Sequence, residues 1–160
     1  MIEPIIAHSI TRSTDEAVKL WAFASAQYPT LYPQMINTVA NSIIESVSVF
    51  ALNSRRSLVL LPYNKKFLLS QPRWIWMPYS DNDELILDFR DALNRVIHAK
   101  ELKVGFESVP NHMSVIENGT VVVPYVKAAT DRKRLSYIDL FSLSYAFLYD
   151  VLPMINQLSE

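Results

Sequence analysis

The 160-residue sequence predicts a mainly α-helical (α+β) domain: a four-helix bundle-like arrangement with a small antiparallel β-hairpin or sheet inserted before the last helix. Apolar residues recur at three- and four-residue spacing in four segments, which is typical of amphipathic helices. Between the third and fourth of these segments, short apolar runs flank an Asn-Gly pair, which is typical of a hairpin. The length suits a single domain over residues 1–160, and we place the β insertion at 101–128.

The first helix is expected to begin at Ser13. Residues Ser13 to Glu16 have the capping-box pattern, in which the Ser13 hydroxyl accepts a hydrogen bond from the amide of residue 16 and the Glu16 side chain reaches back. Apolar residues then follow at helical spacing until Pro29 ends the run. A second helix begins near Pro33, because proline is well tolerated in a first turn, and its apolar stripe continues to about Ser54.

Residues 55–80 are expected to be irregular, with a short strand or helical turn, because Pro62, Pro72 and Pro78 interrupt the apolar runs. The segment interleaves basic and aromatic side chains, a pattern that can stack nucleic-acid bases. In a proline-broken segment such aromatic side chains more often anchor the core. The residues of this pattern are Arg55, Arg56, Lys65, Lys66 and Arg73, with Trp74, Trp76 and Tyr79.

A third helix is expected to begin at Ser80, where acidic residues favour the positive end of the helix dipole, and to run to about Lys100. The hydrophobic period then changes. Asn118-Gly119 lies between apolar runs at 113–116 and 120–123, which predicts a two-residue type I′ turn in which both residues need positive φ. Residues 102–108 are expected to add a further strand, with Gly105 inside it.

A last helix is expected to start at Ser136 with a capping-box-like pattern and to run to Leu152, before Pro153. Its surface is apolar nearly all round, so it either lies at the centre of the core or is shared with a partner subunit. The charged run Asp131 to Arg134 precedes it. Such a run can touch a phosphate backbone but is more often a solvated loop.

Composition excludes several classes of function. With two glycines the chain has no glycine-rich phosphate loop and no nucleophile elbow. Without cysteine it has no thiol catalysis, thiolate zinc site or disulfide framework. His8, His98 and His112 do not have metal-ligand spacing, so we expect neither a metal nor a cofactor.

The formal net charge of -1 argues against a protein that coats polyanions over its whole surface. The first 80 residues carry seven basic and four acidic side chains, and the other 80 carry eight and twelve, which permits a local basic patch. The N-terminus lacks the features of a signal peptide, and the apolar stretch 135–152 is too short and too polar for a membrane span. We therefore expect a cytoplasmic location and no membrane partner.

The candidate functional residues lie on the expected third helix. Arg90, Asn94 and His98 follow at four-residue steps, so they lie along one side of the helix. Such a stripe can bind a phosphate, with His98 as general acid or base and Arg90 stabilising developing charge. In the structural alternative, Arg90 pairs with Asp91 or a neighbouring helix, Asn94 hydrogen-bonds a loop, and His98 caps the helix.

The stretch from Arg90-Asp91 to His98 resembles the Arg-polar-x(n)-His motif of the HEPN-domain family, with one residue more than the family spacing. The expected helix count is also similar to that family's α-bundle. The resemblance implies metal-independent RNA cleavage in toxin or antiviral defence systems, and homodimers that bring two motifs together. It implies that Arg90 contacts the scissile phosphate, that Asp91 is the polar residue after the arginine, and that His98 is the acid or base.

A second interpretation is a non-enzymatic, homo-oligomeric interaction protein. In this case the aromatic side chains of the last expected helix form the interface between subunits, because that helix is too apolar to pack through one side only. These side chains are Tyr137, Phe141, Tyr145, Phe147 and Tyr149.

Overall fold

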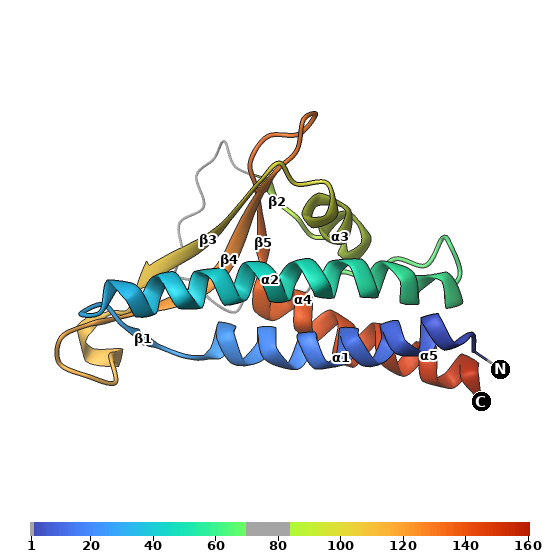
Figure 1. The fold of residues 1–160 in the computed structure, drawn as a ribbon, viewed down its shortest axis with the longest axis horizontal. Coiled ribbons are helices and arrows are strands. Elements are labelled where there is room, and N and C mark those ends of the chain that lie inside the picture. The colour runs from blue at the N-terminus through green and yellow to red at the C-terminus, as the bar shows by residue number, and fades with distance from the viewer. Residues whose placement is uncertain (1, 70–83) are drawn as a thin grey trace.

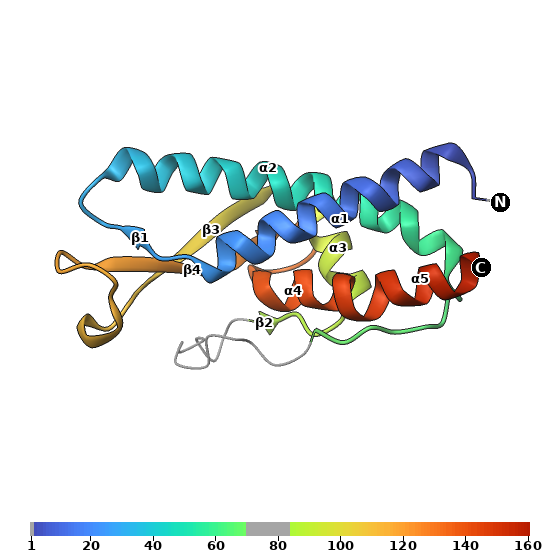
Figure 2. The ribbon, with the colours of Figure 1, turned by 90° about the horizontal axis from the view of Figure 1, so that it is seen from below.

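The computed structural model describes residues 2–69 and 84–160. The chain folds as a mainly helical α+β structure, which confirms the predicted class in its coarse form (Figure 1). Its small sheet is mixed, whereas a wholly antiparallel one was expected. Helix α1 (Pro4–Ser25) and helix α2 (Pro33–Ser57) pack side by side. Helix α4 (Leu140–Ala146) continues through a π-helical turn (Phe147–Val151) into α5 (Leu152–Ser159), and this segment runs along α1 (Figure 2).

The core lies where these helices meet the sheet. Its largest fully buried side chains come from all of the main helices and from β5, and Phe50 of α2 contacts both Phe89 and Phe147 edge-to-face. Burial of such aromatic and aliphatic side chains is the main force that holds the layers together. The fully buried set includes Leu20, Ile43, Leu58, Leu93, Ile138, Leu140 and Leu143.

Helix α1 begins at Pro4, nine residues before the expected start, so the capping box at Ser13 is wrong. Proline fits the first turn of a helix, so the helix can begin at Pro4 and include the residues between Pro4 and Ser13. Ser13 instead donates a hydrogen bond to the carbonyl of Ser9 at 2.8 Å. The Glu16 carboxylate is buried and accepts a 2.6 Å hydrogen bond from Ser46 of α2, so it ties the two long helices together.

The predicted start of α2 at Pro33 is confirmed, and the helix ends at Ser57. Together with the 3-10 turn Leu58–Leu60 it is long and apolar enough, by length and composition alone, to cross a membrane. It packs on α1 and α3, as the core helix of a soluble protein also does. The expected irregular segment contains this turn and a β-bridge between Leu68 and Asp88. The prediction for Arg73, Trp74, Trp76 and Tyr79 lies outside the described residues.

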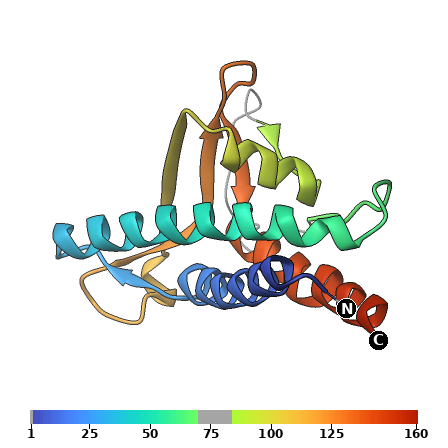
Figure 3. The same ribbon diagram turned by 45° about the vertical axis from the view of Figure 1, so that its right-hand side comes forward.

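Strands β3 (Glu101–Ser108), β4 (Thr120–Ala129) and β5 (Ser136–Asp139) form antiparallel pairs, with β4 in the middle (Figure 3). The two-residue strand β1 (Tyr28–Pro29) pairs with the start of β4, and β2 (Glu84–Leu85) pairs with β5 in parallel. The predicted strand at 102–108 is confirmed. The sheet as a whole extends beyond the expected insertion at 101–128.

The type I′ hairpin at Asn118-Gly119 is wrong. Gly119 has the expected positive φ of 87°, but no other residue in the described ranges does, and residues 113–116 are not a strand. The side chain of Gln27 explains the difference, because it donates to the carbonyl of Met113 and accepts from the amide of Val115, each at 3.0 Å. These hydrogen bonds take the place of a strand ladder.

The last helix begins four residues later than expected, because 136–139 form strand β5. Asp139 is the N-cap and accepts a 2.7 Å hydrogen bond from the amide of Ser142. The helix also continues past Pro153, which lies in the first turn of α5. The π-helical turn Phe147–Val151 comes directly before Pro153 and has a different hydrogen-bond pattern from an α-helix. The missing N–H of the proline therefore does not end the helix.

Helix α3 (Phe89–Ile97) is shorter than the expected helix over 80–100. Asp88 is its N-cap and accepts a 2.9 Å hydrogen bond from the amide of Asp91. Residues 84–85, expected to be helical, pair with β5, because this pairing satisfies backbone groups at the edge of the sheet. Helix α3 thereby lies beside the sheet, close to the end of β4 (Figure 3).

Candidate functional site

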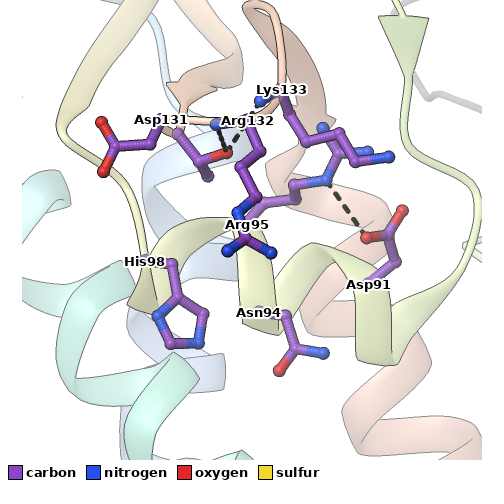
Figure 4. Close-up of a pocket in the computed structure, with 8 residues that line it drawn as sticks. Asp91, Asn94, Arg95, His98, Asp131, Arg132 and Lys133 are labelled. Atoms are coloured by element: carbon purple, nitrogen blue, oxygen red, sulfur yellow. Dashed lines mark hydrogen bonds and ion pairs between the residues drawn. The ribbon is translucent and has the colours of Figure 1, made fainter.

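A cavity of about 490 Å³ lies between helix α3 and the loop that joins β4 to β5 (Figure 4). One wall is the side of α3 that carries two of the predicted residues, Asn94 and His98, and the other is the charged run after β4. The cavity is lined by Asp91, Asn94, Arg95 and His98 from α3 and its C-cap, and by Thr130, Asp131, Arg132 and Lys133 from the loop.

Thr130 shapes the loop wall of this cavity. Its hydroxyl accepts hydrogen bonds from the amides of Arg132, at 3.4 Å, and Lys133, at 3.1 Å. Asp131 forms a 2.6 Å ion pair with Lys100, which neutralises the acidic member of the run. Figure 4 shows the Arg132 side chain extending from the loop towards α3, where Asn94 and His98 lie. Arg132 and Lys133 are exposed and have no ion pair or hydrogen bond through their side-chain cations in the described structure.

Arg95 fixes the floor of the cavity to the rest of the protein. It is 5% exposed, and its guanidinium donates to Asp91 at 3.1 Å, to Ser136 of β5 at 2.8 Å and to Glu84 of β2 at 3.3 Å. The planar fork of donors on arginine suits such a three-way contact. Two carboxylates already balance the Arg95 charge, so this residue positions α3 against the sheet.

His98 is the C-cap residue of α3. Its backbone amide donates to the carbonyl of Asn94 at 3.0 Å, whereas its exposed ring has no hydrogen-bond partner among residues 2–69 and 84–160. Both ring nitrogens are therefore without a protein partner in the described ranges. A neutral imidazole offers one donor and one acceptor, which is what general acid or base chemistry requires.

Asn94 lies on a second cavity as well as the first. Its side-chain carbonyl accepts a 3.3 Å hydrogen bond from Arg55 of α2. This second cavity measures about 340 Å³ and lies between α3, the end of α2 and the segment that follows α2. It is lined by Arg55, Tyr63, Asn64, Lys65, Lys66, Asp88, Arg90 and Asn94.

Arg90 lines the second cavity, not the one that contains His98. Its guanidinium donates to the backbone carbonyls of Pro62 and Lys65, each at 3.3 Å, and so holds the segment after α2 against α3. Of the three predicted site residues, Asn94 thus joins the two cavities, while Arg90 and His98 line different ones.

The sequence indicated no functional role for Arg95. For the run that contains Arg132 and Lys133 it left two interpretations open, contact with a phosphate backbone and the more common solvated loop. The available signal was the charge run at 131–134 directly after a strand. This run lies beside α3 only because β4 pairs with β5. Pairing between strands leaves no pattern in the local sequence, so the position of the run could not be predicted.

The first cavity contains more cationic than anionic side chains. Arg132 and Lys133 supply cations, and Asn94 and His98 supply further polar groups, whereas Asp91 and Asp131 are held in ion pairs. A phosphate group fits such a set of donors. Within the described residues there is no group of three or more metal-ligating side chains of His, Cys, Asp or Glu. Comparison with known proteins finds no matching family model, no matching curated protein and no matching solved structure.

Proposed function

We propose that this chain is an RNA-directed protein that binds phosphates of the RNA backbone in the cavity between α3 and the β4–β5 loop. The observation that carries the proposal is the exposed pair Arg132 and Lys133, without an acidic partner in the described residues, opposite His98 and Asn94. Lys and Arg contacts to phosphates supply most of the affinity of proteins for nucleic acids. The overall charge of -1 means that binding would be confined to this local basic surface.

The proposal extends to metal-independent ribonuclease activity of the HEPN-like kind, in a toxin or antiviral defence system. His98 is the candidate acid or base, because its ring is exposed and lines the cavity. The cation beside it is Arg132, whereas Arg90 contacts the carbonyls of Pro62 and Lys65. We also propose that the helices form a four-helix bundle-like domain and that the protein acts in the cytoplasm as a homodimer.

Binding is tested by measuring the affinity of purified protein for a fluorescent RNA, with Arg132→Gln as the test variant. Loss of one phosphate contact should weaken binding roughly tenfold, which corresponds to about 1.4 kcal/mol. Arg134→Gln is the matched control, because it removes the same charge from the same loop but Arg134 does not line the cavity. Equal losses in the two variants would contradict a specific site and indicate a general charge effect.

Catalysis is tested separately with His98→Gln. If His98 is the acid or base, this variant should cleave RNA about 10²- to 10⁴-fold more slowly than the native protein, with its RNA affinity retained. Native protein that binds RNA but cleaves neither single-stranded RNA nor tRNA would contradict the nuclease part of the proposal. Cleavage at an unchanged rate in His98→Gln would contradict the role of this residue.

A second candidate function is a non-enzymatic homo-oligomer. The observation that favours it is an aromatic cluster formed by α1, α4 and the π-helical turn after α4. The ring centroids of Trp21 and Phe141 lie 4.4 Å apart, and Tyr145 stacks on Tyr149 at 4.6 Å between centroids. Tyr149 remains 59% exposed. Sedimentation of native protein and of Tyr149→Ser tests this function, which predicts a dimer that the substitution weakens. A native monomer at micromolar concentration would contradict it.

A further inference from the structure

We infer that the RNA bound at this site is single-stranded, that it crosses α3 from the first cavity to the second, and that Tyr63 stacks on one of its bases. This inference rests on the proposed function and specifies its ligand. Three features of the described residues carry it: a lining residue that the two cavities share, the cations of the second cavity, and an exposed aromatic ring beside those cations.

The two cavities lie on either side of Asn94, which lines both. Arg55 donates to the Asn94 side chain, so a cation of the second cavity already lies at this junction. Arg90 and His98, which mark the two ends, are separated by about 12 Å at the rise of 1.5 Å per helical residue. A ligand that fills both cavities must therefore be extended, as a polynucleotide backbone is.

The second cavity repeats the charge pattern of the first. Lys65, Lys66 and Arg55 line it, are exposed, and form no ion pair in the described part of the chain. Its acidic member, Asp88, is used as the N-cap of α3, where one carboxylate oxygen accepts from the amide of Asp91. Arg90 is used to hold the neighbouring segment. Three cations thus remain for backbone phosphates on this side of α3.

Tyr63 is 93% exposed and lines the same cavity. Its ring has no aromatic or hydrogen-bond partner among the residues described, so packing does not explain its position. An aromatic ring next to a basic groove is the arrangement by which proteins bind single-stranded nucleic acids, because every unstacked base offers a π face. In a duplex the bases stack on one another, so Tyr63 would discriminate against double-stranded RNA.

The test is fluorescence anisotropy with a labelled 12-nucleotide RNA, both single-stranded and annealed to its complement, on native protein, Tyr63→Ala and Tyr63→Phe. We expect the native protein to prefer the single strand. Tyr63→Ala should bind it roughly 5- to 100-fold more weakly, the range for loss of one stacked base, with little effect on the duplex. Tyr63→Phe should keep the affinity, because it keeps the ring. The control is Tyr32→Ala, which removes an exposed tyrosine that lines neither cavity.

The outcomes separate this inference from the proposed function. If Arg132→Gln weakens RNA binding but Tyr63→Ala does not, or if duplex binds as tightly as single strand, the proposed function stands and the inference is overturned. If the native protein binds no RNA, the proposed function fails and the inference with it. The Tyr63 variants should fold as the native protein does, because the Tyr63 side chain lies in solvent. The segment around it is held through the backbone carbonyls of Pro62 and Lys65, which accept hydrogen bonds from Arg90.

Discussion

At the scale of single residues, Arg95 connects three elements of the molecule. It is buried, and it links α3 to β5 through Ser136 and to β2 through Glu84. Both carboxylate partners are about half exposed, which limits the electrostatic part of the contact. The arrangement of α3 beside the sheet, and hence the first cavity, depends on this side chain.

Replacement of Arg95 by Gln should lower the free energy of unfolding by roughly 1.5–3 kcal/mol, the range for hydrogen bonds to charged groups. Urea unfolding measures the change. Arg132→Gln is the control, because Arg132 is exposed and has no ion pair in the described structure, so its loss should alter stability by less than about 0.5 kcal/mol. A similar small change in Arg95→Gln would contradict the role of Arg95 in positioning α3.

Tyr28 gives a pH-dependent prediction. Burial raises the pKa of Tyr28 to about 12, and its hydroxyl donates to the carbonyl of Phe23 at 2.9 Å. Between the unfolded pKa of 10.0 and the folded value, the unfolded chain loses this proton first, so stability falls as the pH rises through this range. Tyr28→Phe should reduce the loss of stability between pH 10 and 12, measured by thermal unfolding. Tyr63→Phe, in the exposed tyrosine, should leave the pH profile unchanged.

Sequence reasoning at this scale placed Arg90, Asn94 and His98 on one side of a helix, and the structure confirms that α3 carries Arg90 and Asn94 and ends at His98 as its C-cap. Helical periodicity is local, so the sequence contains it. The partners of these side chains are not local: the contacts of Arg90 and Asn94 come from residues 25 to 39 positions away. For this reason the separation of Arg90 from His98 into two cavities had no signature in the sequence.

At the scale of elements, the strand pair β3–β4 depends on a glycine beneath an aromatic ring. A Cβ atom at Gly105 would clash with the ring of Tyr125. That ring is held by edge-to-face contact with Tyr137, with centroids 4.7 Å apart, and by a hydrogen bond from its hydroxyl to Glu107. The glycine is therefore required by the packing of the ring over the strand.

Gly105→Ala should destabilise the protein by about 1–3 kcal/mol, as overpacking of a filled site does. Thermal unfolding measures the loss. Removal of the ring by Tyr125→Val should itself destabilise the protein, but the combined variant should lose less than the sum of the two changes, because the clash no longer exists. Additive losses would contradict the close approach as the cause.

Elements with a strong local pattern were the most predictable. The start of α2 at Pro33 and the strand at 102–108 follow from periodicity and proline placement. Residues 113–116 and 136–139 were misassigned because tertiary contacts decide them: Gln27 binds the backbone of the first segment, and β4 pairs with the second. The local pattern predicted a hairpin for the first segment and a helix cap for the second, and in both the tertiary contacts outweighed it.

In the whole molecule, a small sheet packs against the helices, and the charged loop between β4 and β5 lies beside α3 (Figure 1). Seven of the fifteen basic side chains line the two cavities beside this short helix, although the net charge of the chain is close to zero. Such a distribution favours a polyanion that binds at one site over one that coats the surface. This is the physical basis of the proposed function.

The proposed binding of RNA phosphates by Arg132 and Lys133 is measured by the salt dependence of RNA affinity. Each phosphate contact to a single strand contributes about -0.7 to the slope of log K against log salt. The double variant Arg132→Gln/Lys133→Gln should therefore have a slope shallower than that of the native protein by about 1.4, since two contacts at about 0.7 each are lost. A native slope that stays unchanged in the double variant would contradict the claim.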